Sequence, residues 1–184
     1  MSRLPFRFLH AGDLHLEVPL HGIAEVPDQL RELLLEANYT AAGRVFDTAI
    51  NEEVDFVVLA GDVVHAETAG LRALVFLSEQ FRRLEARGID VYWCGGRVDP
   101  PDAWPDAVAL PENVHRFGEA DVQEFKCRRN DVPVARIAGI ARRKSRKLPL
   151  QKFPKRGTGA FPIGVAHAND APHQPEPPPP PAYE

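Results

Sequence analysis

The chain has 184 residues, a length that suits one well-buried domain and is short for two. Hydrophobic residues make up 44% of it and charged residues 26%, with a net charge of -4, so the composition is that of an ordinary globular protein and excludes wholesale disorder. No apolar run approaches the roughly 20 residues that span a bilayer, and the first residues lack a signal-peptide core. We therefore expect a cytoplasmic protein with no membrane segment.

The first part of the sequence alternates between strand-like and helix-like segments. Residues 7–11 form a short apolar run between Pro5 and Gly12, which predicts a strand. A helical pattern begins at Asp28, a residue type that favours helix N-caps. The pattern strengthens after Tyr39, where apolar residues recur at helical spacing.

A second strand, a second helix and a third strand follow. Residues 55–60 are a nearly continuous apolar run, which is typical of a strand covered on both faces. Residues 70–88 carry one apolar stripe and end at Gly88, a typical helix stop. Residues 89–94 predict another strand. This alternation predicts an α/β fold with a parallel sheet and right-handed crossovers.

The remaining sequence has a different pattern. Residues 100–111 are proline-rich and irregular. We interpret four shorter β-like runs as the second half of a sheet sandwich: residues 114–117, 122–125, 134–141 and 161–167. Residues 170–184 include unbroken proline from 177 to 181 and predict an extended or disordered tail. The two cysteines have no C-x-x-C spacing and are expected to be reduced.

Side chains that ligate metals follow several of the predicted strands. Asp13 and His15 come after the first strand, Asp62 follows the second, and His167 ends the last. In open parallel sheets, ligands bind beyond the carboxyl ends of the strands. An extended chain places residues i and i+2 on the same side, so Asp13 and His15 can reach one cation. An isolated D-x-H is more often a polar turn, and the later strand ends are what favour a metal site.

Together these motifs resemble the calcineurin-like metallophosphoesterase superfamily. D-x-H at 13–15, G-D at 61–62, G-G-x-x-D at 95–99 and His167 occur in that family's order. The residues around the first and third motifs most resemble the DNA repair exonuclease branch, the SbcD-like proteins. The resemblance implies a layered β-sheet sandwich flanked by helices, with its carboxyl-terminal part missing. On this basis residues 1–169 form a partial metallophosphoesterase domain.

The resemblance also implies phosphodiester hydrolysis by a two-metal site. Two cations roughly 3.5–4 Å apart activate the attacking water and offset charge on the phosphate oxygens. By resemblance, Asp13 and His15 hold the first metal, Asp62 bridges both metals, and His167 belongs to the second. Carboxylate and imidazole ligands suit Mn, Fe or Zn, with Mn as the first expectation.

The sequence departs from the family's G-N-H-D motif at two positions. Arg97 stands where the family has the asparagine that binds the second metal, and Val98 stands where it has the histidine that assists the leaving group. Asp99 is retained. A later G-H-x-H pair of metal-binding histidines is also missing. We therefore assign no catalytic residue and expect weakened or lost activity.

Arg97 also affects the number of cations expected. A unit charge about 4 Å from a divalent cation is repelled by roughly 8 kcal/mol at an effective dielectric constant near 20, so we expect one ion rather than two. One hypothesis is that Arg97 replaces part of the second metal's charge by pairing with Asp62 or Asp99. The alternative is that it points into solvent. His65 is either a group behind the metal ligands or a loop histidine, and we favour the loop.

Basic residues gather between Lys126 and Arg156. This segment contains over half of the 22 lysines and arginines, opposed there only by Asp131. It is either a surface that binds DNA or a solvated loop, and both remain open because no aromatic stacking residues are interleaved. An ATPase partner with a coiled coil is implied by the resemblance alone.

Three interpretations of function remain. The first is a metal-dependent phosphodiesterase that acts on DNA, as the resemblance implies. The second is a non-catalytic relative that binds nucleic acid or acts as a scaffold. The third is a truncated gene product, whose missing strands would leave a sheet edge and apolar surface exposed.

Overall fold

The computed structural model describes residues 4–17, 27–65, 70–141, 148–155 and 159–167. The predicted tail, residues 170–184, lies outside these ranges. The order of elements is β1 (Phe8–Ala11), α1 (Asp28–Asn51), β2 (Phe56–Leu59), α2 (Leu71–Glu85), β3 (Asp90–Cys94), β4 (Val114–Phe117), β5 (Gln123–Arg129), β6 (Val132–Ile140), a short 3₁₀ turn (Leu150–Lys152) and β7 (Phe161–Ala166).

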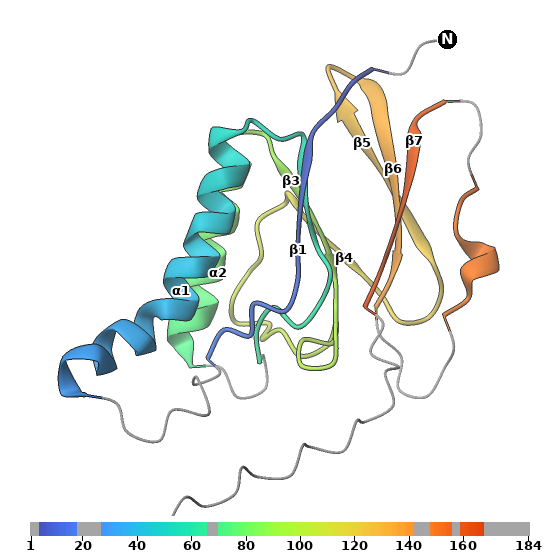
Figure 1. Ribbon diagram of the computed structural model, residues 1–184. Helices are drawn as coiled ribbons and strands as arrows, with labels where there is room; N and C mark the ends of the chain where they lie inside the picture. Colours follow the sequence, from blue (N-terminus) through green and yellow to red (C-terminus); the bar gives the residue numbers. More distant parts are fainter. Residues whose placement is uncertain (1–3, 18–26, 66–69, 142–147, 156–158, 168–184) are drawn as a thin grey trace, which may run out of the picture.

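The first sheet has four parallel strands in the order β1-β2-β3-β4 (Figure 1). The alternation of strands and helices predicted its first three strands. The assignment of residues 114–117 to the second half of the sandwich was wrong, because β4 pairs in parallel with β3. A parallel partner requires a long crossover, and the proline-rich residues 95–113 provide one without a helix.

The second sheet has three strands in the order β5-β6-β7. Strands β5 and β6 form an antiparallel hairpin, whose turn residues Asn130 and Asp131 both have positive φ, at 50° and 63°. Two consecutive residues of this kind are typical of the turns that match the twist of a hairpin. Strand β7 pairs in parallel with β6, so that β7 ends at the same side of the molecule as β1.

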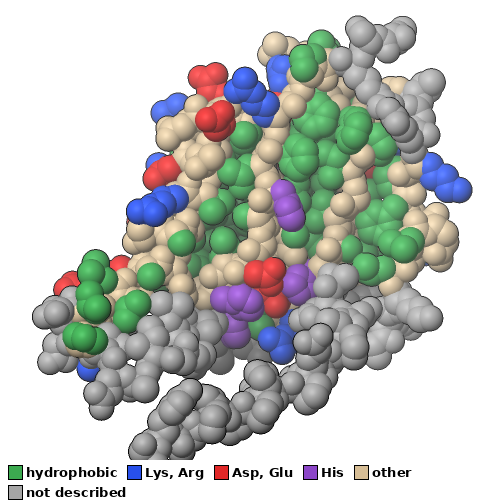
Figure 2. Space-filling model, viewed as in Figure 1, with side chains coloured by type: hydrophobic (Ala, Val, Ile, Leu, Met, Phe, Trp, Pro, Cys, Tyr) green, Lys and Arg blue, Asp and Glu red, His purple; other side chains and the backbone are tan. Residues whose placement is uncertain are grey.

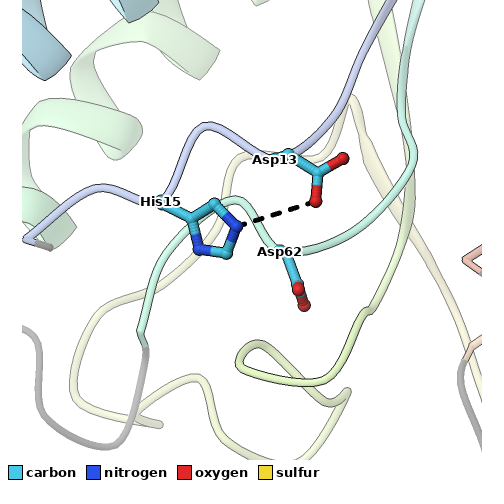
Figure 3. Close-up of side chains that lie close together, drawn as sticks. All are labelled: Asp13, His15 and Asp62. Atoms are coloured by element: carbon cyan, nitrogen blue, oxygen red, sulfur yellow. Dashed lines mark ion pairs between the residues drawn. The ribbon is translucent and has the colours of Figure 1, made fainter. Parts of the chain in front are cut away.

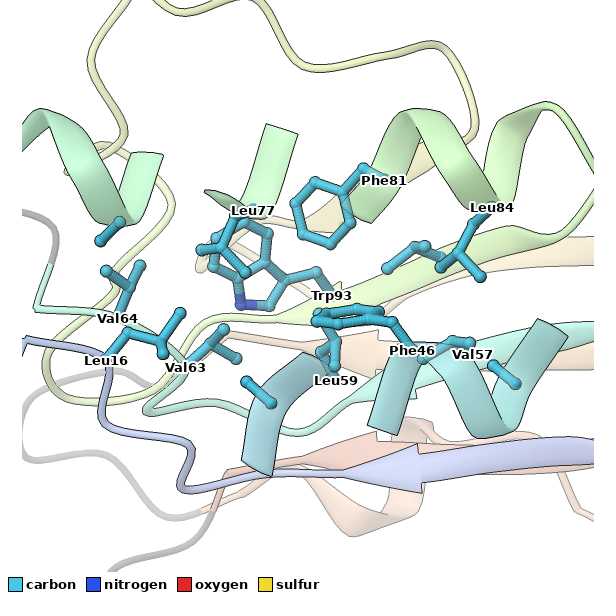
Figure 4. Packing of buried hydrophobic residues seen from close by; sticks show 14 of the residues in the cluster. Leu16, Phe46, Val57, Leu59, Val63, Val64, Leu77, Phe81, Leu84 and Trp93 are labelled. Atoms are coloured by element: carbon cyan, nitrogen blue, oxygen red, sulfur yellow. The ribbon is translucent and has the colours of Figure 1, made fainter. Parts of the chain in front are cut away.

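The elements form three layers, with both helices on one face of the first sheet and the second sheet on the other (Figure 1). Every residue of β2 is buried, and successive residues face different layers. Val57 and Leu59 pack beneath the helices with Phe46 (Figure 4), whereas Phe56 and Val58 pack between the sheets. The continuous apolar run in the sequence therefore reflects burial on both faces, and the α/β sandwich flanked by helices is confirmed.

The helix α2 ends as its sequence predicts. Gly88 has a φ of 66°, and its N–H donates to the carbonyl of Glu85 at 2.9 Å. The N–H of the next residue, Ile89, donates to the carbonyl of Leu84 at 3.0 Å, and the chain then enters β3. Among the residues that the structure describes, neither helix has the length and apolar composition needed to cross a bilayer.

The open side of the sandwich lies between the two outer strands β1 and β7. Figure 2 shows apolar side chains at the surface along this side. Phe8 of β1 is 42% exposed and Phe161 of β7 is 40% exposed, and Phe6 lies between the strands with its ring 5.8 Å from that of Phe161. The two strand edges and the aromatic rings therefore face solvent in the described part of the chain.

Candidate metal centre

Asp13 and His15 are held against the loop after β2 by a continuation of the strand ladder. The N–H of Asp13 donates to the carbonyl of Gly61 at 3.0 Å, and the N–H of His15 donates to that of Asp62, also at 3.0 Å. Leu16 then pairs with Val64 in an isolated parallel bridge, and its side chain is fully buried. Backbone pairing beyond the strand ends therefore sets the D-x-H motif beside Asp62.

The backbone is left-handed at all three ligand candidates. The φ angles are 53° at Asp13, 45° at His15 and 51° at Asp62. Asp13 and His15 were expected to converge because an extended chain places residues i and i+2 on the same side. The backbone at both residues is instead left-handed, so a loop brings the two side chains together. A left-handed backbone costs free energy for residues other than glycine, and residues held in this conformation occur most often at functional sites.

The three side chains offer ligand atoms that all lie within 4.8 Å of one another (Figure 3). Nε2 of His15 is 3.6 Å from Oδ1 of Asp13. Asp13 and His15 have side chains 70% and 34% exposed, while Asp62 is buried. The group is thus anchored at Asp62 and open to solvent at Asp13.

His167 lies on the other side of Asp62. Its Nδ1 is 2.9 Å from the carbonyl oxygen of Ala60, an acceptor that requires a proton on Nδ1. Its Nε2 is 3.5 Å from Oδ2 of Asp62 and has no hydrogen-bond partner among the described residues, although it is buried. In the neutral ring, a lone pair therefore faces a carboxylate. A buried acceptor without a donor fits a metal ligand.

The four side chains also fit a cation by their chemistry. Asp13 and Asp62 supply carboxylates, and His15 and His167 supply imidazoles. This mixed set suits Mn, Fe or Zn better than Mg or Ca. The structure therefore brings three of the predicted ligands together and places the fourth beside them.

Asp62 is also bound by the loop that follows β3. Its Oδ1 accepts the backbone N–H groups of Arg97 at 2.6 Å and of Val98 at 3.1 Å. The Arg97 side chain is exposed, and among the described residues no ion pair joins its guanidinium to Asp62 or Asp99. This placement favours the alternative in which Arg97 points to solvent. Backbone amides, not the guanidinium, contact the carboxylate.

Asp99 fixes this loop from within the protein. Its side chain is only 1% exposed and accepts four hydrogen bonds: from the N–H groups of Asp62, Val63 and Gly96, and from the indole of Trp93. Burial raises the pKa of Asp99, although these donors favour the carboxylate. Asp99 thus joins the loops after β2 and β3.

His65 was favoured as a loop histidine, but its ring lies against a ligand candidate. Its Nε2 is 3.4 Å from Nδ1 of His15, and the two ring centroids are 5.6 Å apart. Burial lowers the pKa of His65, and the neighbouring His15 lowers it further. In the sequence, the only available signal was a histidine three residues after Asp62.

Two glycines permit the close approach of these loops. Gly61 has a φ of 93°, and a Cβ atom there would lie 2.8 Å from the His167 ring. A Cβ atom on Gly96 would lie 2.4 Å from both the backbone nitrogen and Oδ1 of Asp62. No side chain fits at such distances without displacing the loops.

We expect Gly96→Ala to lower the free energy of unfolding by about 1–3 kcal/mol, because the new methyl group displaces Asp62 or its loop. Gly43→Ala is the matched control, since Gly43 lies within α1 and a Cβ there meets no atom within 4 Å. It should be stabilising by about 0.5–1 kcal/mol. Urea denaturation measures both, and equal effects of the two substitutions would contradict this geometry.

Several cations of the basic segment are paired within the chain. Arg129 binds Asp55 with its Nη2 at 2.6 Å, Arg136 lies 3.6 Å from Glu124, and Lys152 lies 2.7 Å from Asp121. Residues 142–147, the most basic stretch, lie outside the described residues. Acidic residues outside the segment therefore offset part of its charge.

Comparison with known proteins identifies the family of this chain. Residues 6–152 match the calcineurin-like phosphoesterase family, a range that includes Asp13, His15 and Asp62 and ends before His167. The chain is also 32% identical over 162 residues to YhaO of Bacillus subtilis (strain 168), described as an uncharacterized metallophosphoesterase. That alignment covers 87% of this chain and 40% of the relative, so the chain spans well under half of the relative's length. The chain belongs to the calcineurin-like phosphoesterase family.

Proposed function

We propose that this protein binds one divalent transition metal and is a phosphodiesterase of the DNA repair exonuclease type with low hydrolytic activity. The observation that carries the proposal is the group of Asp13, His15 and Asp62, whose ligand atoms lie within 4.8 Å of one another in left-handed loops. His167 completes the set through its contact with Asp62. Mn²⁺ is the first candidate, with Fe and Zn as alternatives.

The bound metal would activate water and offset charge on the phosphate oxygens. The chain's own residues determine how much of the family's chemistry remains. Asp62 and His167 anchor the site, whereas Asp13 is exposed and lies where a substrate phosphate can approach. Oδ1 of Asp62 already accepts two backbone N–H groups. These hydrogen bonds support a single cation. If Asp62 bridged two cations, its Oδ1 would be needed as a ligand for the second one, but that oxygen is already bound by the two N–H groups.

Low activity follows from the side chains beyond the ligands. Val98 is the residue that follows Arg97 in the loop bound to Asp62, and its side chain has no proton to give to a leaving group. Loss of general acid catalysis costs roughly 10²–10⁴-fold in rate. A substrate with a good leaving group depends less on such a donor and is therefore the better probe.

The direct experiment is hydrolysis of bis-p-nitrophenyl phosphate in the presence of Mn²⁺, by wild-type protein and by Asp13→Ala. We expect slow hydrolysis by the wild type and a rate at the buffer background for Asp13→Ala, because the site loses a carboxylate ligand. Asp106→Ala, at an exposed aspartate, is the matched control and should retain the wild-type rate. Equal rates with Asp13→Ala and the wild type would contradict the proposal.

Nucleic-acid binding without cleavage is the second candidate, favoured by Val98 and by the basic segment. Phosphate contacts from lysine and arginine release counterions, so such binding weakens steeply as salt rises. We expect affinity for single- or double-stranded DNA to fall at least about 10-fold between 50 and 200 mM salt. Binding that does not change over this range would argue against a nucleic-acid surface.

A further inference from the structure

The two ring nitrogens of His15 face different groups. Its Nε2 lies on the side of the candidate metal ligands, 3.6 Å from Oδ1 of Asp13. Its Nδ1 lies on the other side, 3.4 Å from Nε2 of His65. A neutral imidazole carries one proton, so only one of these nitrogens can offer a lone pair to a cation.

We propose that His65 is a positioning residue: its Nε2 accepts the proton on Nδ1 of His15, and this hydrogen bond directs the lone pair on Nε2 of His15 toward the metal. The inference rests on the proposed metal site. A metal-bound histidine generally donates its other N–H to an acceptor, which fixes the tautomer and the orientation of the ring. His65 supplies that acceptor from a neighbouring loop.

The backbone holds the two rings in this relation. Leu16, the residue after His15, pairs with Val64, the residue before His65, in a parallel bridge. The side chains of Leu16 and Val64 are fully buried in the core beneath the helices. The histidine pair is therefore attached to a rigid part of the protein, although both rings are only partly buried.

A different use of the same pair is a second cation held between Nδ1 of His15 and Nε2 of His65. The separation of 3.4 Å does not by itself distinguish a shared proton from a shared metal. The location of the proton in the metal-free protein does distinguish them, as does the number of metal ions bound.

The first test is long-range ¹H–¹⁵N correlation NMR of the metal-free wild-type protein at pH 8. We expect His15 to be in the tautomer that carries its proton on Nδ1. A His15 ring protonated on Nε2 would overturn the proposal. Because this measurement needs neither a substitution nor bound metal, it remains informative if a variant fails to fold or if the proposed metal site is wrong.

The second test is calorimetric titration of Mn²⁺ into His65→Ala, His65→Gln and the wild type. We expect His65→Ala to weaken Mn²⁺ binding about 10- to 100-fold, the usual effect of losing such a partner. His65→Gln should stay within about 3-fold of the wild type, because its amide oxygen also accepts the proton. His10→Ala is the matched control, since His10 is exposed on β1, and should bind as the wild type does.

The possible outcomes separate this inference from the proposed function. If the wild type binds no Mn²⁺, the proposed function fails; the NMR tautomer then tests the hydrogen bond alone, which a proton on Nδ1 of His15 supports and a proton on Nε2 overturns. If the wild type binds one ion and His65→Ala binds it equally well, this inference fails and the metal site stands. A second ion that is lost in His65→Ala would also overturn it, in favour of the shared cation.

Discussion

Asp99→Ala is expected to lower the free energy of unfolding by about 3–5 kcal/mol, the largest effect of any single substitution near the site. Asp99 accepts hydrogen bonds from three backbone N–H groups and from the indole of Trp93, at 2.7 to 3.1 Å. Removing the carboxylate leaves these donors without an acceptor inside the protein, and each buried donor left unpaired costs about 1–3 kcal/mol. Water that enters the vacated space recovers part of this loss.

Urea denaturation of metal-free protein measures the effect of Asp99→Ala. Asp99→Asn should fall between the wild type and Asp99→Ala, because the amide keeps one oxygen that accepts. Asp106→Ala is the control in the same part of the chain: Asp106 is exposed, and its substitution should change stability by less than about 0.5 kcal/mol. An unfolding midpoint for Asp99→Ala equal to that for Asp106→Ala would contradict the role assigned to Asp99.

Asp62→Asn is expected to weaken Mn²⁺ binding by more than about 100-fold while leaving the metal-free protein as stable as the wild type or more so. The asparagine oxygen can still accept the N–H groups of Arg97 and Val98. Its NH₂ group would face Nε2 of His167, which is 3.5 Å from the present carboxylate oxygen and has no hydrogen-bond partner in the described part of the chain. The substitution therefore supplies a missing donor and removes a negative charge from the metal site.

The two parts of this prediction require two measurements at pH 8, where an ordinary histidine is neutral. Thermal unfolding of metal-free protein should give a midpoint equal to or above that of the wild type. Calorimetric titration of Mn²⁺ should show the loss of affinity. The loss should exceed the roughly 10- to 100-fold seen when a residue that only orients a metal ligand is replaced, because Asp62 is itself one of the proposed ligands. A variant that unfolds more easily yet binds Mn²⁺ within 10-fold of the wild type would contradict both parts.

Periodicity in the sequence predicted where the ligand candidates lie but not how the backbone presents them. Residues that follow the parallel strands of one sheet gather at one edge, so the positions of Asp13 and Asp62 were accessible from the pattern of strands alone. His167 follows a strand of the second sheet, and only the family resemblance assigned it to the site. The left-handed backbone at Asp13, His15 and Asp62 was not accessible from the sequence, because none of these is glycine and local propensity disfavours it. Pairing with the loop after β2 overrides that propensity.

The contacts around the ligands depended on long-range packing and were predicted less well. The sequence showed Asp99 only as the retained aspartate of an altered motif, yet it binds the N–H groups of residues more than 30 positions away. His65 was favoured as a loop residue, because nothing local indicates that the bridge between Leu16 and Val64 brings it to His15. β4 was assigned to the wrong sheet for a similar reason. The path of the chain between β3 and β4 determines which sheet β4 joins, and the four residues of β4 do not indicate that path.

The number of Mn²⁺ ions bound per chain tests the central claim most directly. Calorimetric titration of metal-free wild-type protein, repeated with Asp13→Ala, measures that number and its dependence on the D-x-H motif. We predict one ion per chain for the wild type and no measurable binding for Asp13→Ala. Two tightly held ions per wild-type chain, or none, would contradict the account.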